Sequence, residues 1–499
     1  MVTSRRAFLR GLGLGGLAAA TAGAAAFLES GCAEEASRPV EAEAAARPNV
    51  VFILTDDMRW DAMSCAGHPL LKTPHIDRLA AEGARFTNAF VTTSLCSPSR
   101  ASLLSGLYAH AHGILNNFTD FPADLPSWPR RLHEAGYETA YIGKWHMGEQ
   151  EDRPRPGFDF WMSHKGQGNY FDNEFNVNGR REVRKGYYTT VVTDAAVEWL
   201  KAPHSKPFAL CLGQKAPHGG PIQPEPRYEH FLDQVEIKKP ANAGAYEDGK
   251  PAWLKASVPT WHGIEGPLYG QKEYGKFVRA YLGCIASVED SVGRVLAALE
   301  ETGQLDRTIV VFTSDNGFAL GEHGRVDKRT MYEESIRVPL VVRYPPRIRK
   351  GTVVPQMVLT VDLAPSLLDL CGAPPLAKVH GRSWRPLLEG RPDGWRKSWH
   401  YAYNYESEFP YTPNVRGVRT EEWKYIHYPH GDCSPDLHRS ELYDLRADPL
   451  ETHNLIADPA FTAKHKELIV ELDRLMAATG ALPDKMPVDE GIKTNLPRY

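Results

Sequence analysis

Short apolar runs alternate with amphipathic stretches along most of this chain. Continuous apolar runs are typical of strands buried on both faces of a parallel sheet, and they occur at residues 49–54, 137–142, 208–212, 308–313 and 338–342. Apolar residues at helical spacing predict helices between these strands, at residues 75–84, 274–302 and 361–370. Because strands alternate with helices, we expect an α/β fold built on a doubly wound sheet.

The pattern changes after about residue 395. Alternating aromatic positions, typical of antiparallel strands, follow at residues 401–405, 423–428 and 441–445, with an amphipathic helix at residues 464–478. We therefore predict a large α/β domain at residues 48–394 and a smaller α+β domain at residues 395–499. Within the first, residues 223–269 are rich in proline, glycine and charge. We expect them to form a long surface excursion of the kind that shapes a binding site.

Polar clusters directly follow four of the predicted strands. In open α/β sheets, ligands bind at the carboxyl ends of the strands, so this repetition places a functional site at one edge of the sheet. The clusters are Thr55-Asp56-Asp57, Gly143-Lys144-Trp145-His146, Gln214-Lys215-Ala216-Pro217-His218 and Ser314-Asp315-Asn316-Gly317.

Two of these clusters offer metal ligands. Asp56 and Asp57 are adjacent acids, and two carboxylates packed together repel each other unless a cation neutralises them. Asp315 and Asn316 supply two more oxygen donors. Hard oxygen ligands without a His or Cys cluster favour Ca²⁺ or Mg²⁺ over zinc. The alternative interpretation is turn chemistry, because Asp-Asp and Asp-Asn-Gly are common turn sequences.

Composition narrows the functional classes. The 499 residues carry a net charge of -4, which is small for this length and argues against nucleic acid as a partner. Seven cysteines are scattered singly without a C-x-x-C pair. This argues against both a disulfide framework and a structural zinc site.

The first residues predict export rather than fold. Ser4-Arg5-Arg6-Ala7-Phe8-Leu9 and the Gly/Ala/Leu-rich stretch after it resemble a twin-arginine signal, which we assign to residues 1–32. Ser30-Gly31-Cys32 resembles a lipoprotein cleavage site with a lipid anchor on Cys32, although Glu29 is unusual there. Residues 33–47 form an Ala/Glu-rich flexible tether. We expect a periplasmic or envelope-attached protein.

The segment from Leu95 to Gly106 carries the most specific signal. Cys96-Ser97-Pro98-Ser99-Arg100 is followed by small residues and leucines that predict a buried helix, with Pro98 suited to its first turn. Cys96 then lies at a helix N-terminus, where backbone N–H groups and the helix dipole favour an anion. By itself, a cysteine here would be an ordinary buried thiol.

This segment resembles the C-x-P-S-R signature of type I sulfatases. In that family a formylglycine-generating enzyme oxidises the cysteine to Cα-formylglycine, an aldehyde whose hydrate is the nucleophile. The resemblance implies an alkaline-phosphatase-like fold and one calcium ion held by Asp56, Asp57, Asp315, Asn316 and the modified Cys96. It extends over most of residues 47–455 and includes the E-L-Y-D-L segment that begins at Glu441.

Further motifs extend the resemblance to individual roles. Lys144 and His146 alternate along a segment that we expect to be extended, so they point the same way. The family's G-K-W-H-x-G box implies that Lys144 contacts the sulfate and that His146 bonds to the formylglycine hydroxyl. Arg100 follows Cys96 by one helical turn and would hold the nucleophile. His218 would meet the leaving group, and Lys328 would bind the sulfate.

The chemistry implied by the resemblance is coherent. Arg100, Lys144, Lys328, His218 and a divalent cation form a positive cradle for the charge that builds as the ester bond breaks. A hydroxyl of the hydrated aldehyde attacks sulfur, and either His218 or Lys328 protonates the leaving alcohol. His146 then deprotonates the second hydroxyl, which eliminates sulfate.

The substrate is suggested by residues around Lys328. Asp327-Lys328-Arg329, Tyr332-Glu333 and Arg337-Val338-Pro339-Leu340 resemble the N-acetylglucosamine-6-sulfatase branch, which implies a sulfated carbohydrate as substrate and exo action on a 6-O-sulfate. Alternatives are an arylsulfatase of broad specificity, a phosphoester or phosphonate hydrolase of the same superfamily, and a glycan-binding pseudoenzyme with unmodified Cys96. The Cys96 to Arg100 motif argues against the phosphoester alternative.

Overall fold

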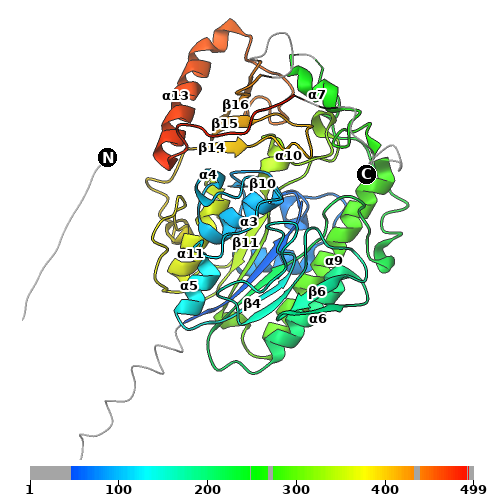
Figure 1. The fold of residues 1–499 in the computed structure, drawn as a ribbon, viewed down its shortest axis with the longest axis vertical. Helices are drawn as coiled ribbons and strands as arrows, with labels where there is room; N and C mark the ends of the chain where they lie inside the picture. Colours follow the sequence, from blue (N-terminus) through cyan, green and yellow to red (C-terminus); the bar gives the residue numbers. More distant parts are fainter. Residues whose placement is uncertain (1–46, 248, 268–273, 432–438, 492, 494–499) are drawn as a thin grey trace, which may run out of the picture. The chain divides into compact units, whose positions relative to one another are not determined.

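The computed structural model describes residues 47–247, 249–267, 274–431, 439–491 and 493, and these described residues belong to one unit (Figure 1). The predicted export signal, Cys32 and all but the last residue of the tether lie outside the described residues. Among the helices of the described ranges, none is long and apolar enough to cross a membrane.

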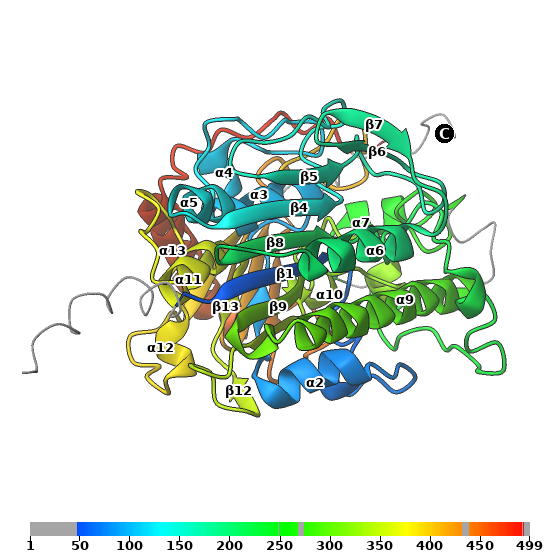
Figure 2. The ribbon, with the colours of Figure 1, turned by 90° about the horizontal axis from the view of Figure 1, so that it is seen from below.

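A ten-stranded sheet forms the centre of this unit (Figure 2). Its strands, in spatial order, are β12 (Thr352–Val354), β2 (Ala84–Phe86), β11 (Leu340–Arg343), β9 (Thr308–Ser314), β1 (Asn49–Thr55), β8 (Phe208–Gly213), β4 (Glu138–Gly143), β5 (Phe160–Ser163), β6 (Glu174–Val177) and β7 (Arg180–Val183). All residues of β1, β8 and β9 are buried. Burial on both faces explains their continuous apolar sequences.

The sheet is mixed rather than uniformly parallel. β9, β1, β8, β4 and β5 run parallel to one another, as the apolar runs predict for the first four. β11, which covers most of the predicted strand at residues 338–342, instead pairs antiparallel with both β9 and β2. Periodicity reports burial but not strand direction, so an apolar run alone could not distinguish the two arrangements.

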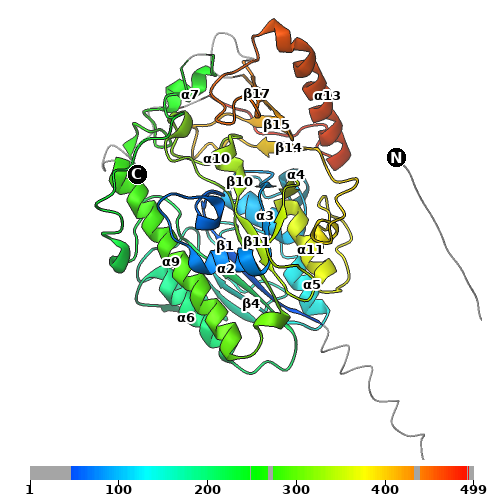
Figure 3. The same cartoon turned by 180° about the vertical axis from the view of Figure 1, so that it is seen from behind.

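Helices cover both faces of the sheet (Figures 1 and 3). One face packs against α2 (Pro74–Glu82), α6 (Tyr188–Lys201) and α9 (Tyr274–Glu301). The other packs against α3 (Cys96–Ser105), α5 (Trp128–Glu134) and α11 (Leu363–Leu370). This arrangement confirms the doubly wound architecture, and α9 and α11 lie within a few residues of their predicted ranges.

The C-terminal part forms a second, four-stranded antiparallel sheet. Its strands are β14 (Ser398–Tyr403), β15 (Val415–Thr420), β16 (Trp423–His427) and β17 (Glu441–Asp444), and α13 (Thr462–Thr479) packs on them. The antiparallel strands and the amphipathic helix were predicted, whereas β15 was not. The boundary at residues 394 and 395 stays a prediction.

Shorter elements complete the described fold. They are the small sheet of β10 (Arg337–Val338), β3 (Ala89–Phe90) and β13 (Val358–Leu359), and the helices α4 (Ala109–His112), α7 (Ala252–Ser257), α10 (Glu333–Ile336) and α12 (Arg385–Leu388).

Candidate active site

Four neighbouring parallel strands deliver the polar clusters to one edge of the main sheet. β9, β1, β8 and β4 lie side by side in this order, so their carboxyl ends meet. The clusters that follow them, at residues 55–57, 143–146, 214–218 and 314–317, therefore converge as the sequence predicts. α3 adds Cys96 at its first residue and Arg100 one turn later.

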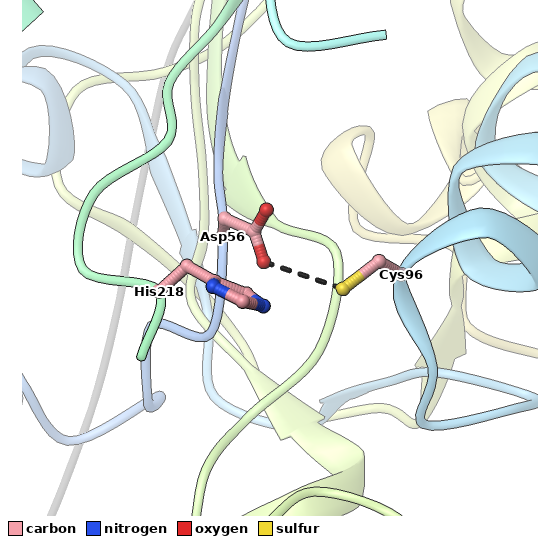
Figure 4. Close-up of side chains that lie close together, drawn as sticks. All are labelled: Asp56, Cys96 and His218. Carbon is pink, nitrogen blue, oxygen red and sulfur yellow. Dashed lines mark hydrogen bonds between the residues drawn. The ribbon is translucent and has the colours of Figure 1, made fainter. Parts of the chain in front are cut away.

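Three carboxylates and the Cys96 thiol lie at the centre of this site. One ligand atom each from Asp56, Asp57, Asp315 and Cys96 lies within 4.8 Å of the others. Cys96 Sγ is 3.4 Å from Asp56 Oδ1, and His218 approaches the same pair (Figure 4). All four clustered residues are at most 1% exposed. Such a concentration of buried acid requires compensation by cations.

Three cationic side chains provide part of that compensation. Arg100 Nε donates to Asp315 Oδ2 at 2.8 Å, and Arg100 Nη2 donates to Asp56 Oδ2 at 3.2 Å. Lys144 pairs with the same Asp56 oxygen. Lys328 Nζ lies 2.5 Å from Asp57 Oδ1 and 2.9 Å from Cys96 Sγ. Three cations therefore balance three carboxylates, so a divalent ion would make the site electropositive.

Burial and charge shift the three carboxyl pKa values differently. Burial opposes ionisation of Asp56, but the charges of Lys144, Arg100 and Lys328 outweigh it and hold its pKa well below the usual range. Burial raises the pKa of Asp57 to about 7, and repulsion from Asp56 adds to this despite Lys328. Burial and Asp56 likewise raise the pKa of Asp315. Burial thus disfavours the ionised forms of Asp57 and Asp315 even though three cations match three carboxylates, and a bound cation would favour those ionised forms.

Asn316 has an unused oxygen beside this cluster. Its Nδ2 donates to Asp57 Oδ1 at 2.5 Å, while its buried Oδ1 has no hydrogen-bond partner among the described residues. A buried acceptor without a partner is costly. Asn316 Oδ1 and the oxygens of Asp56, Asp57 and Asp315 therefore fit a hard divalent cation.

His146 departs from its expected geometry. Its φ is +45°, so the segment with Lys144 is not extended, and the expectation that the two side chains point the same way for that reason is wrong. His146 Nε2 bonds to Glu149 Oε1 at 2.9 Å. Burial and then the charge of Lys144 lower the pKa of His146 well below its usual value. The imidazole is therefore neutral at neutral pH, and its buried Nδ1, which has no hydrogen-bond partner among the described residues, is placed to accept a hydrogen bond.

His218 lies at the mouth of the cluster. Its Nε2 is 3.8 Å from Asp57 Oδ2, and its side chain is 15% exposed. Burial, with the charges of Lys144 and Lys328, lowers its pKa well below the usual value. His218 therefore faces the approach to the site, where a leaving group would be, but as a neutral ring it would need a proton first. Lys328, whose pKa the carboxylates raise despite burial, is already protonated.

A cavity of about 590 Å³ leads from solvent to these residues. At the end nearest Cys96, the cavity is lined by Asp57, His218 and Lys328. Farther out it is lined by aromatic and polar side chains. The outer lining comprises Asn117, Phe118, Glu149, Gln150, Gln167, Trp261, His262, Phe318, Val326, Asp327, Arg329, Glu408 and Phe409.

The cavity wall only partly follows the sequence-based expectation. The long excursion contributes Trp261 and His262 as predicted, but it is not confined to the surface, since Trp253 within it is only 1% exposed. From the C-terminal part, the described lining residues come from the loop between β14 and β15, through Glu408 and Phe409.

Sequence reasoning missed two residues that support the cluster. Gln167 accepts a hydrogen bond from Lys144 through its side chain, and its backbone oxygen accepts one from Lys215 Nζ at 3.1 Å. Burial and the charge of Lys144 lower the pKa of Lys215 to about 7. Lys215 lay inside a strand-end cluster, whereas Gln167 follows no motif that could have marked it.

Comparison with known proteins identifies the family. The sulfatase family model matches residues 48–373, and the model for the N-sulphoglucosamine sulphohydrolase C-terminal region matches residues 321–478. The chain belongs to the sulfatase family. This confirms the resemblance drawn from the Cys96 motif and the prediction that the protein is a hydrolase of sulfate esters.

Relatives and solved structures agree with this assignment. N-acetylglucosamine-6-O-sulfatase of Bacteroides thetaiotaomicron is 35% identical, with 86% of each chain aligned. Arylsulfatase K of Gallus gallus is 31% identical, with 86% of this chain and 82% of the relative aligned. The structure of BT4656 with its substrate D-glucosamine-2-N,6-O-disulfate matches with a TM-score of 0.80 and 34% identity, over 88% of this chain and 99% of that one.

Phosphonate monoester hydrolase of Agrobacterium radiobacter shares the fold. It matches with a TM-score of 0.72 at 24% identity, over 90% of this chain and 100% of that one. The predicted alkaline-phosphatase-like fold is therefore confirmed.

Replacing Arg100 should destabilise the fold, because the cluster would lose one of its three cations. In Arg100→Met, Asp56 and Asp315 lose a guanidinium partner that belongs to a side chain only 1% exposed. We expect the free energy of unfolding, measured with denaturant in the presence of a chelator, to fall by about 3–5 kcal/mol. Arg474→Met, at an ion pair in which the Arg474 side chain is 59% exposed, should change this free energy by less than about 0.5 kcal/mol. An Arg100→Met protein as stable as wild type would contradict this electrostatic account.

Proposed function

We propose that this sulfatase hydrolyses a 6-O-sulfate on a terminal sugar of the N-acetylglucosamine type, using a formylglycine formed from Cys96 and one bound Ca²⁺. The observation that carries the proposal is that the charged cluster opens directly into the outer cavity. Lys328 contacts Cys96 and also lines a cavity with aromatic and polar walls. The names of the relative and of the ligand-bound structure support the sugar.

The outer cavity has the features of a sugar site. Trp261, Phe118 and Phe409 offer aromatic faces, which bury the apolar C–H side of a sugar ring. Asp327 and Arg329 offer polar groups at the same wall, held by an ion pair of 2.9 Å. Because Asp327, Lys328 and Arg329 are consecutive, one short segment can contact both the sugar hydroxyls and the sulfate.

The residues of the chain have distinct roles in the proposed reaction. When bound, Ca²⁺ would supply positive charge against the sulfate oxygens, and the aldehyde hydrate at position 96 would supply the attacking hydroxyl. Lys144, Lys328 and Arg100 stabilise the added negative charge, because they are preorganised in a dry site. Lys328 holds a proton beside the leaving oxygen. Neutral His146, oriented by Glu149, accepts a proton when sulfate is released.

A multifunctional relative raises phosphoester hydrolysis as a second candidate activity. PehA of Trinickia caryophylli, described as a multifunctional alkaline phosphatase superfamily protein, is 30% identical over 84% of this chain. Phosphomonoesters carry more negative charge than sulfate monoesters. The balance of three cations against three carboxylates favours the singly charged sulfate ester.

Export and maturation are part of the proposal. The residues around Arg5 and Arg6 support twin-arginine export to the periplasm or cell envelope, and Ser30-Gly31-Cys32 supports a lipid anchor at Cys32. This route moves folded proteins. Cys96 is completely buried in the fold, so we propose that the formylglycine-generating enzyme acts in the cytoplasm before folding.

Loss of the Cys96 thiol should abolish sulfate release without unfolding the protein. Cys96→Ala removes the proposed aldehyde precursor, whereas Cys211→Ala changes a buried thiol on β8 and should retain turnover. Intact-mass analysis of the wild-type peptide containing Cys96 should show a species lighter than the thiol form. Turnover by Cys96→Ala, or an active wild type that carries only thiol, would refute the assignment.

Calcium should stabilise the fold through Asn316. An ion that binds only the native state adds about 2.7 kcal/mol of stability at one hundred times its Kd. We expect Ca²⁺ to raise the Tm of chelator-treated wild type, and Asn316→Ala to lose most of that rise. Asn242→Ala, at a buried asparagine outside the cluster, should keep it. Equal Ca²⁺ responses in all three proteins would exclude this ligand set.

Sugar sulfates should be better substrates than an aryl sulfate. An aryl group lacks the ring hydroxyls that Asp327 and Arg329 could orient, so it should lose transition-state binding energy. The measurement compares kcat/KM for 6-O-, 4-O-, 2-O- and N-sulfated glucosamines with that for a nitrophenyl sulfate, on one preparation. We expect the 6-O-sulfate to rank first. An aryl sulfate that outperforms every sugar would indicate an arylsulfatase instead.

A further inference from the structure

The loop at residues 404–414 forms one wall of the sugar cavity. Phe409 stacks on His262 with ring centroids 5.8 Å apart, and the Arg329 guanidinium lies 5.1 Å from the Phe409 ring. Glu406, only 1% exposed, accepts a 2.6 Å hydrogen bond from Arg329 Nε. Thr412 Oγ1 accepts one from Arg325 at 2.9 Å. The loop therefore sets the position of the Arg329 side chain.

The opposite side of this loop is held by the segment at residues 484–491, named here the C-terminal strap. Asn414 is completely buried between the two. Its backbone N–H donates to Asp489 Oδ2 at 2.8 Å, its Nδ2 donates to the Pro487 carbonyl at 2.8 Å, and its Oδ1 accepts from Tyr405 N at 2.9 Å. Asn414 thus joins both ends of the loop to the strap.

Two further contacts attach the strap near the base of the loop. Arg416 forms a bidentate ion pair with Asp484, with distances of 2.6 and 2.9 Å. The same guanidinium donates to the Tyr403 carbonyl at 2.8 Å and to Asn404 Oδ1 at 2.9 Å. The Tyr405 hydroxyl donates to the Gly491 carbonyl at 3.3 Å. In Figure 1 the strap belongs to the red segment that follows α13.

From these contacts we infer that the C-terminal strap is a positioning element for sugar recognition. It holds the 404–414 loop so that Phe409 and Arg329 present a fixed wall to the sugar ring. The inference rests on the proposed sugar-sulfatase function. A loop that is not held must be ordered by the substrate, and that entropic cost weakens binding. Cys96, Asp56 and Asp315 lie on α3 and at the ends of β1 and β9, so these three residues are positioned by α3 and the main sheet rather than by the strap.

The strap should therefore affect sugar sulfates and aryl sulfates differently. Asp489→Ala removes the acceptor for Asn414 N and for Gly491 N. We expect KM for the 6-O-sulfated sugar to rise about tenfold, as two lost hydrogen bonds would allow, with kcat nearly unchanged. The kcat/KM for nitrophenyl sulfate should stay within about twofold of wild type, because this substrate makes little use of the wall.

Matched variants separate positioning from general stability. Asp489→Asn keeps an oxygen acceptor and should restore most of the sugar affinity. Glu490→Ala removes a neighbouring carboxylate that is 58% exposed and pairs with Lys493, so it should behave as wild type. Tyr405→Phe deletes only the hydroxyl that bonds to Gly491 and should raise KM for the sugar modestly. This milder variant tests the inference if Asp489→Ala does not fold.

The outcomes distinguish this inference from the proposed function. A rise in KM confined to sugar sulfates supports the strap. Equal losses on sugar and aryl substrates, or no change in either, overturn it while leaving the proposed function standing. Wild type that releases no sulfate from any sugar refutes the proposed function, and this inference with it.

Discussion

Repulsion among three buried carboxylates is the constraint around which the site is organised. Asp56, Asp57 and Asp315 occupy the ends of two adjacent parallel strands, which the β1–β9 ladder fixes in register. The sheet cannot separate these acids without losing its core. Positive charge must therefore be brought to them, and three segments provide it through Arg100, Lys144 and Lys328. The remaining space and the unused oxygen of Asn316 suit one divalent ion.

This balance explains why a singly charged ester suits the site. Three cations against three carboxylates leave little net attraction for an anion, and a divalent ion shifts the balance toward attraction. The same cations are already bonded to the carboxylates, so they need little reorganisation when substrate arrives. Preorganised charge of this kind stabilises a transition state more than mobile surface charge does. The buried pairs thus contribute more to reactivity than to stability, where buried ion pairs are often neutral.

The strand-end chemistry was readable from sequence because its determinants are local. A buried strand followed at once by Asp-Asp or by Ser-Asp-Asn-Gly specifies both the element and its polar end. The Cys96 to Arg100 segment likewise contains its helix start, its buried cysteine and its cation. The antiparallel direction of β11 and the positive φ of His146 were not readable, because both depend on contacts with distant segments. Gln167 lacked any local signal at all.

The wall of the sugar cavity was even less predictable from the sequence. Its members include residues 117–118, 261–262, 326–329 and 408–409, which no sequence periodicity connects. The position of Phe409 depends on Asn414, and that of Asn414 depends on Asp489 and Pro487 near the end of the chain. The reactive residues at the ends of adjacent strands can stay constant while loops that other segments hold in place vary in shape. Within this fold, substrate choice can therefore change through the loop and its supports without disturbing the carboxylate cluster.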